Sequence, residues 1–138
     1  MNIIKLKELF FLVLLPLIIG LMIYIVSRPN TTYILKILNL NNEKLELNYL
    51  LKYNLPDGLW SFSIASLILI IWNWKINLEV LIWFTTLIFC SIILEFMFGT
   101  YDVLDLSFLL IGILTPFIYT LKINFKNKFY EHKKITND

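Results

Sequence analysis

The stretch Leu78–Phe98, with the sequence LEVLIWFTTLIFCSIILEFMF, has only two charged residues, Glu79 and Glu95, one near each end. A helix that crosses the hydrocarbon core of a bilayer needs about 20 mostly apolar residues, which this stretch supplies. Three other apolar stretches of nearly spanning length cover residues 9–26, 59–74 and 104–122. The sequence therefore predicts an all-α membrane protein, a four-transmembrane-helix bundle that forms a single domain over residues 1–138.

The composition of the whole chain agrees with this class. Of its 138 residues, 59% are hydrophobic and 16% are charged, whereas a soluble domain is nearer one half apolar and one quarter charged. The first apolar stretch is longer than the core of a signal peptide and no small-residue cleavage site follows it, so we interpret it as a retained helix. With one cysteine and one histidine, the chain has no disulfide or metal framework, and we expect neither a metal nor a cofactor.

The long first connection, residues 27–58, contains two groups of apolar residues at helical spacing. The first group is Tyr33, Ile34, Ile37 and Leu38, and the second is Leu47, Leu50 and Leu51. We expect two short amphipathic helices that lie on the membrane surface; an irregular loop is the alternative. The last segment, residues 123–138, is rich in lysine and is expected to be a cytoplasmic tail.

The basic residues predict the orientation of the bundle. With four spans, both termini lie on one side, which holds the lysines Lys5, Lys7, Lys75, Lys122, Lys126, Lys128, Lys133 and Lys134. The other side holds Arg28, Lys36, Lys44 and Lys52, all in the long loop. Because basic residues concentrate in cytoplasmic segments, we expect a multi-pass protein with both termini in the cytoplasm. The net charge of +2 then reflects membrane topology, and we expect no nucleic-acid partner.

Charged residues gather at the predicted outer ends of the helices. Asp57 starts the second helix, Glu95 lies near the end of the third, Asp102 and Asp105 open the fourth, and Arg28 follows the first. Helix capping is one interpretation of the three aspartates. Capping does not explain Glu95, because a carboxylate is disfavoured at a helix C-terminus and ionisable residues at membrane depth usually mark a site. We therefore predict a ligand-binding cluster of these five residues, in which Arg28 pairs with Glu95.

The stretch DVLDLSFLLIG, residues 102–112, resembles a pattern of VanZ-like membrane proteins, in which two acids three residues apart are followed by a glycine. Asp102, Asp105 and Gly112 match this pattern, and Glu95 matches the glutamate that ends the preceding helix in the family. SRP after the first helix and LPDGLWSFS at the second are also similar to small VanZ-like proteins. Three polar residues of the family pattern, an Arg, an Asn and a Gln, are replaced here by Gly99, Leu109 and Phe98.

The resemblance implies a small integral protein of the bacterial inner (cytoplasmic) membrane, in a family associated with glycopeptide antibiotic resistance. We favour a non-enzymatic protein, surrounded by membrane lipids, whose outer cluster binds a lipid headgroup, an envelope precursor or a protein partner. The alternative is a membrane enzyme acting on a lipid-linked envelope substrate, with Glu95 or Asp105 as general base. Such an enzyme could hold Mg²⁺ or Ca²⁺ on Glu95, Asp102 and Asp105. No nucleophile accompanies the acids in the sequence, which argues against the enzyme.

Overall fold

The computed structural model describes residues 3–27, 48–98 and 102–135, with side chains up to residue 97 in the second range and 124 in the third. These residues form helices and no strand. In chain order the helices are α1 (Ile3–Leu9), the π-helix η1 (Phe10–Leu14), α2 (Leu15–Ser27), the π-helix η2 (Leu50–Asn54), α4 (Leu55–Ile71), α5 (Leu78–Phe98) and α6 (Val103–Ile135). Arg28, the long loop up to residue 47 and the turn at residues 99–101 lie outside the described residues.

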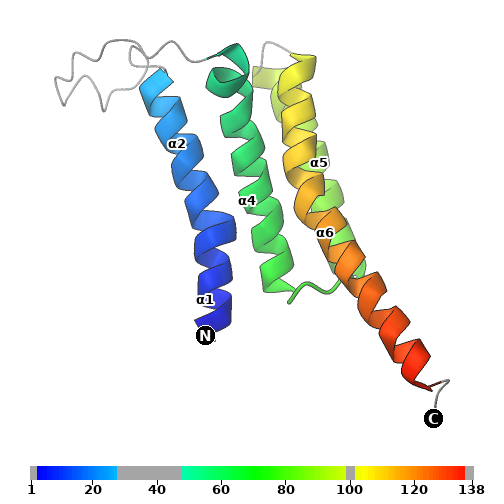
Figure 1. Cartoon of the computed structure of the whole chain (residues 1–138). Coiled ribbons are helices and arrows are strands. Elements are labelled where there is room, and N and C mark those ends of the chain that lie inside the picture. The colour runs from blue at the N-terminus through cyan, green and yellow to red at the C-terminus, as the bar shows by residue number, and fades with distance from the viewer. Residues whose placement is uncertain (1–2, 28–47, 99–101, 136–138) are drawn as a thin grey trace.

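Within these ranges, four continuous helices are long and apolar enough to cross a membrane: Ile3–Ser27, Leu50–Ile71, Leu78–Met97 and Val103–Asn124. The prediction of an all-helical chain with four such helices is confirmed. Figure 1 shows that α1 begins and α6 ends at the same end of the molecule. At the opposite end α4 and α6 begin and α2 and α5 end. We call it the acidic end, because Asp57, Glu95, Asp102 and Asp105 belong to these helix ends.

Three of the predicted helices have boundaries that differ from the observed ones. The first helix begins at Ile3 and not at residue 9, the second covers residues 50–71 and not 59–74, and α6 continues to Ile135 through the predicted tail. Polar residues do not by themselves end a helix, and residues 117–135 contain neither glycine nor proline to stop α6. Of the two predicted surface helices, the first lies outside the described residues. The described part of the second leads into η2 and runs on into α4.

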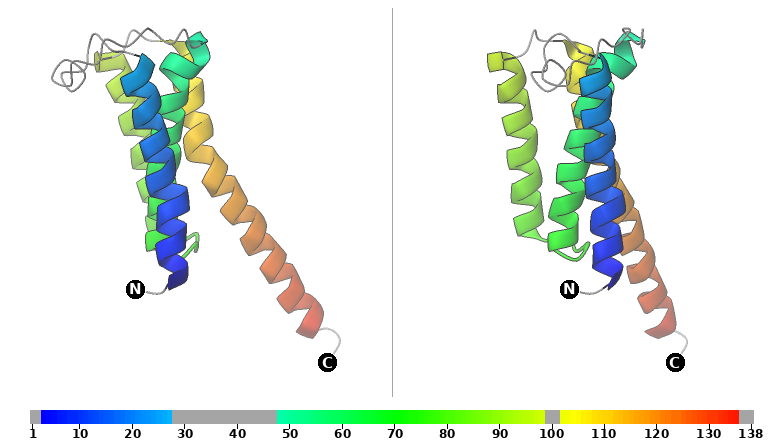
Figure 2. Two further views of the ribbon diagram at one scale, coloured as in Figure 1. Left: turned by 60° about the vertical axis from the view of Figure 1, so that its left-hand side comes forward. Right: turned by 90° about the vertical axis from the view of Figure 1, so that its left-hand side faces the viewer.

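The central helix of the bundle is α4. It packs against α2 on one side and against α5 and α6 on the other (Figure 1). In the most apolar part of the spanning helix Leu50–Ile71, 56% of the residues are buried, whereas only 11% are buried in that of α5, which is the least buried of the four described spanning helices. Figure 2 shows that the C-terminal half of α6 leans away from the other helices.

The helices α4 and α6 approach each other closely at two glycines. A Cβ atom added to Gly112 would lie inside contact distance of the Gly58 carbonyl oxygen and the Ser61 hydroxyl. A Cβ atom added to Gly58 would lie 3.2 Å from the carbonyl oxygen of Phe108. Small residues at facing positions allow the backbones of membrane helices to come together. Here they hold the first half of α6 against the first turns of α4.

The hydrophobic core lies toward the end of the bundle opposite the acidic end. Its buried members come from three helices: Ala65, Ile68 and Leu69 of α4, Val80 and Phe84 of α5, and Ile113 of α6. The ring of Phe84 also packs against the ring of Phe117, with centroids 4.8 Å apart. This cluster holds the first half of α5 against α4 and α6.

The turn between α4 and α5 connects further helices at that end. Asn73 and Trp74 have positive φ values of 52° and 59°, which end α4 abruptly. The indole N–H of Trp74 donates to Glu8 of α1 at 3.1 Å. Its carbonyl oxygen accepts a hydrogen bond from the side chain of Asn124 of α6 at 3.1 Å. A single turn residue therefore links α1, α4 and α6.

Both π-helices end two residues before a proline, η1 before Pro16 and η2 before Pro56. In each case the amide of the intervening leucine donates to the carbonyl five residues earlier, Leu15 to Phe10 and Leu55 to Leu50. A proline inside a helix lacks the N–H group and its ring clashes with the carbonyl four residues earlier. The wider π-turn gives that carbonyl more room, so each helix passes its proline without a break.

Replacing Gly112 with alanine is expected to lower the free energy of unfolding by about 1–3 kcal/mol, because the new methyl group would push α6 away from Gly58 and Ser61. Helix propensity acts in the opposite direction, since alanine is favoured over glycine by about 1 kcal/mol. Thermal unfolding in one detergent checks the prediction, with Ile111→Ala on the exposed face of α6 as the matched control. An unchanged or raised melting temperature for Gly112→Ala would contradict it.

Candidate ligand-binding crevice

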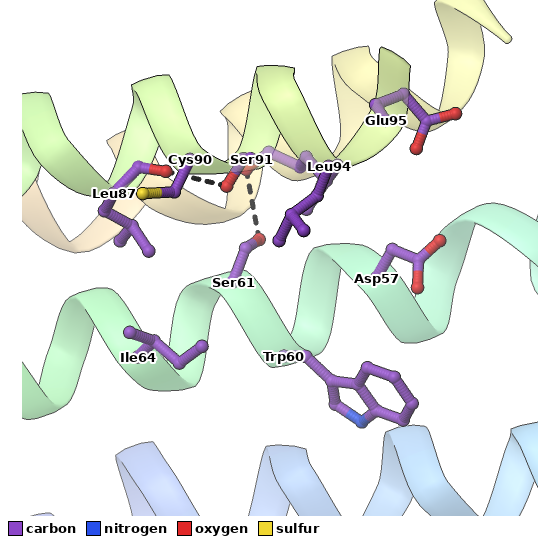
Figure 3. A pocket seen from close by; sticks show the side chains of 10 residues that line it. Asp57, Trp60, Ser61, Ile64, Leu87, Cys90, Ser91, Leu94 and Glu95 are labelled. Atoms are coloured by element: carbon purple, nitrogen blue, oxygen red, sulfur yellow. Dashed lines mark hydrogen bonds between the residues drawn. The ribbon is translucent and has the colours of Figure 1, made fainter. Parts of the chain in front are cut away.

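A crevice with a volume of about 440 Å³ lies between α4 and α5 (Figure 3). Its lining consists of Asp57, Trp60, Ser61 and Ile64 of α4, Leu87, Cys90, Ser91, Leu94 and Glu95 of α5, and Leu109 of α6. The core residues of these helices occupy the other half of α4 and of α5. The crevice therefore begins where the core packing between the two helices stops.

Two carboxylates stand at one end of the crevice. Asp57 lies in the first turn of α4 and Glu95 in the last turn of α5, and the antiparallel course of the two helices brings these turns together. Figure 3 shows both carboxylates at the same end of the crevice, with Ile64 and Leu87 at the other. No lysine, arginine or histidine is among the described residues that line it. Within the described part of the chain, Glu95 has no hydrogen bond or ion pair.

The two serines of the crevice have their protons engaged by main-chain carbonyls. The hydroxyl of Ser91 donates to the carbonyl oxygen of Leu87 at 2.8 Å. The hydroxyl of Ser61 lies 3.0 Å from the carbonyl oxygens of both Gly58 and Leu109, and its single proton serves one of them at a time. Toward a ligand, these hydroxyls therefore present lone pairs and no free proton.

Trp60 lines the crevice without turning its N–H group toward it. Figure 3 shows the indole nitrogen directed away from the crevice. A Cβ atom added to Gly20 of α2 would lie 2.6 Å from that nitrogen, which places the indole between α2 and α4. The ring of Tyr24 lies 6.0 Å from the Trp60 ring, centroid to centroid. Apart from the carboxylates and hydroxyls, the crevice is therefore lined by apolar surface and one thiol.

Asp102 and Asp105 are not among the crevice residues; they join the start of α6 to the residues before α4. One carboxylate oxygen of Asp102 accepts the Leu104 N–H at 2.9 Å and caps α6, and the other accepts the Tyr49 hydroxyl at 3.0 Å. Asp105 accepts a hydrogen bond from the side-chain amide of Asn54 at 2.6 Å. Asp102 is therefore a helix cap, the interpretation that the sequence left open.

Asn54 is fully buried at this contact. Its Oδ1 atom has no hydrogen-bond partner within the described residues. An unpaired buried amide oxygen costs free energy, whereas the hydrogen bond from the same amide to a carboxylate is of the strong, charge-assisted kind. The Asn54–Asp105 hydrogen bond is therefore the main polar link between η2 and α6.

The described structure places the predicted site residues in two groups of contacts. Asp57 and Glu95 share the crevice, Asp102 and Asp105 contact Tyr49 and Asn54, and Arg28 lies outside the described residues. The pairing of Arg28 with Glu95 stays a prediction. The carboxylate set considered for Mg²⁺ or Ca²⁺ is not assembled: in the described ranges no three His, Cys, Asp or Glu residues could together hold an ion.

Sequence reasoning missed Tyr49, Asn54, Ser61 and Ser91. The first two were assigned to the loop, and the π-turn between them hides any α-helical spacing. The serines could have been found from the sequence, because each is a hydroxyl four residues from a carboxylate in an apolar helix, Ser61 after Asp57 and Ser91 before Glu95. That shared spacing of four residues places each hydroxyl on the same helix face as the acid.

The hydrogen bond to Asp102 raises the pKa of Tyr49 above its ordinary value, and the negative charges of Asp102 and Asp105 add to the effect. A raised pKa means that the protonated phenol is favoured in the folded state. Its contribution to stability is therefore present below about pH 10, the ordinary tyrosine pKa, and is lost as the pH rises through the folded-state value.

Asp102→Asn should bring the pKa of Tyr49 back toward its ordinary value, because the charge is removed while asparagine still caps the helix. The pH titration of tyrosinate absorbance, taken as the difference between proteins with and without Tyr49→Phe, isolates this one phenol. The melting temperature near neutral pH should change little. A Tyr49 titration midpoint that is the same with Asp102 and with Asn at this position would contradict the assigned contact.

Comparison of the chain with models of known protein families, with curated proteins and with solved structures found no match. The likeness to VanZ-like proteins therefore depends on the residues and spacings quoted above.

Proposed function

We propose that this chain is a VanZ-like, multi-pass protein of the bacterial cell envelope that binds an amphipathic envelope molecule in the crevice between α4 and α5. The observation that carries the proposal is the lining of the crevice, with two carboxylates at one end and apolar side chains along the rest. Sites for small ligands are concave, mostly apolar, furnished with a few polar groups, and about 300–1,000 Å³ in volume. The crevice has this form and, at about 440 Å³, this size.

The position of Glu95 gives separate support. It is half-buried near the end of a membrane-spanning helix, and the next two residues, Phe96 and Met97, are exposed on the outside of the bundle. A carboxylate at such a depth is costly and in membrane proteins commonly marks a ligand or ion site. A ligand group that donates hydrogen bonds to Glu95 would reduce this cost.

The distribution of basic residues supports an orientation with the acidic end outside the cell and both termini in the cytoplasm. The crevice would then take up molecules from the outer leaflet. An association with glycopeptide resistance would follow from the VanZ-like resemblance alone.

An enzyme that acts on a lipid-linked substrate is the second candidate, because Asp57 and Glu95 could serve as an acid and a base. The argument against this enzyme is that the described residues of the crevice include no activated nucleophile. The serine hydroxyls of the crevice donate to main-chain carbonyls, and no histidine is among the described residues that line it. Asp105, the other candidate base, bonds to Asn54 outside the crevice. Binding without chemistry therefore fits the lining better.

The orientation predicts a labelling pattern in intact cells. In a Cys90→Ser background, Val103→Cys at the acidic end should react with a membrane-impermeant thiol reagent, and Leu78→Cys at the other end should not. Both side chains are exposed, 63% and 74% respectively, so a difference between them reports the side of the membrane. The reverse pattern would contradict the orientation.

Cys90 offers a direct test of binding, because it is the only cysteine in the chain, is exposed, and lines the crevice. Lipid extracted from bacterial membranes, added to the detergent-purified protein, should slow alkylation of Cys90 by a small permeant maleimide. The slowing should reach about tenfold at ten times the Kd, since protection follows occupancy.

The matched control is Cys90→Ser combined with Thr85→Cys, which moves the thiol to another exposed face of α5. Position 85 lies about 140° around the helix from position 90, so an occupant of the crevice should leave it reactive. Equal slowing at both positions, or no slowing at Cys90, would contradict the proposed function.

A further inference from the structure

The end of the bundle opposite the acidic end is rich in lysine, and we call it the basic end. Among the side chains that the structure describes, its charged residues are four lysines and two glutamates: Lys5, Lys7, Lys75, Lys122, Glu8 and Glu79. Lys5 is half-buried and the other three lysines are exposed. None of the four forms an ion pair or a side-chain hydrogen bond within the described part of the chain. Their charges are therefore open to a partner outside the chain.

The two glutamates of the basic end bond to tryptophans and not to lysines. The indole N–H of Trp72 donates to Glu79 at 2.6 Å, and that of Trp74 donates to Glu8 at 3.1 Å. These hydrogen bonds satisfy carboxylate oxygens, so the glutamates are held in place without a lysine partner. With four lysines against two glutamates, the described part of this end has a net positive charge.

The residues of this end whose side chains the structure does not describe have the same sign of charge. Residues 125–138 contain four lysines and two acidic residues, and residues 1–2 are methionine and asparagine. They therefore add to the positive charge of the basic end and do not reverse it.

The hydrogen bonds of Trp74 bring the lysines to one level of the bundle. Its indole bonds to Glu8 of α1, and its carbonyl oxygen accepts from the side chain of Asn124 of α6. Three residues of an α-helix rise by about 4.5 Å, and each lysine lies within three residues of a member of this set: Lys75 beside Trp74, Lys5 and Lys7 beside Glu8, and Lys122 beside Asn124.

The spanning helices show where this level lies relative to a membrane. The span Leu50–Ile71 ends just before the turn that contains Trp72 and Trp74, and the span Leu78–Met97 begins just after it. Tryptophan is enriched at the interface between the hydrocarbon core and water. The four lysines therefore lie in the head-group region, which is about 5–8 Å deep on each side of the core.

A lipid leaflet fits this arrangement better than a soluble polyanion. Figure 1 shows α1 on one side of the turn between α4 and α5, and α6 on the other. The lysines thus come from three segments that are distributed around the bundle. The head groups of a leaflet surround the bundle at this level and can meet each lysine separately, whereas a nucleic acid or an acidic protein needs the lysines on one face.

We propose that the basic end binds anionic phospholipid head groups of the adjoining leaflet through Lys7, Lys75 and Lys122. The lipid phosphates meet the exposed ammonium groups, and the acyl chains lie along the helices that end at this level. This lipid-binding surface is separate from the crevice, so the proposal does not depend on the proposed function.

The test measures which lipid contacts the basic end of the full-length protein in phosphatidylcholine vesicles. A Trp60→Phe background leaves Trp72, Trp74 and Trp83, and Trp83 belongs to the same end because its ring lies 6.2 Å from that of Trp72. Bromine on an acyl chain near the head group quenches their fluorescence on contact. Brominated phosphatidylglycerol should compete for contact with the protein about fivefold better than brominated phosphatidylcholine, the factor expected for one well-placed lysine per lipid.

Replacing Lys7, Lys75 and Lys122 together with glutamine should bring this fivefold preference close to one. The matched control replaces the same three residues with arginine, which keeps the charge and should keep the preference. Lys52→Gln at the acidic end should also leave it unchanged. In the chain without any substitution, raising the ionic strength from about 0.01 M to 1 M should remove most of the preference, because the Debye length falls from about 30 Å to 3 Å.

Three results would overturn the proposal. They are equal contact by the two brominated lipids, a preference that the glutamine variant retains in full, and a preference that salt does not reduce. Equal contact by the two lipids, together with tight binding of a short DNA duplex to the same vesicles, would assign the lysines to a soluble polyanion instead. The salt measurement holds even if a substitution impairs folding.

Discussion

The contact between α4 and α6 at Gly58 and Gly112 governs the arrangement of the acidic end. Because the backbones touch there, the first turns of α6 lie beside the residues that precede α4, and Asp102 and Asp105 reach Tyr49 and Asn54. The same contact leaves α5 outside the close pair. α5 is held at its first half by the core around Phe84, and the crevice opens along its second half.

The four acidic residues at this end have different roles because their surroundings differ. Asp102 and Asp105 accept hydrogen bonds from a phenol, an amide and a helix N-terminus, and their role is to fix one helix against another. Asp57 and Glu95 border a crevice whose two serine hydroxyls donate their hydrogen bonds to main-chain carbonyls. The first pair explains how the end of the bundle is held together, and the second pair lines the crevice.

The helices themselves could be predicted from length and hydropathy. In a membrane, a single apolar run such as Leu78–Phe98 satisfies its own backbone hydrogen bonds by forming a helix. An even number of spans also sufficed to bring Asp57 and Glu95 to one end. The crevice could not be predicted, because it depends on how far the packing of Phe84 and its neighbours extends toward Cys90. Hydropathy also did not predict the extension of α6 to Ile135 or the start of the second span at Leu50. The polar residues there are helical because of their contacts and their helix propensity, which hydropathy does not measure.

The π-turn η2 determines the directions in which the side chains of Tyr49 and Asn54 point at the acidic end. In an α-helix, five residues advance by about 500°, so Tyr49 and Asn54 would point in directions about 140° apart. Where the hydrogen bonds run from one residue to the fifth after it, five residues make about one full turn, and the two side chains come to lie on one face. Asp102 and Asp105, three apart on α6, share a face as well, and the two pairs of side chains meet. The π-turn thus acts as a one-residue insertion. A related chain that lacked this residue would continue as a regular α-helix, and it could keep the partner of Asp102 or that of Asp105 in place, but not both.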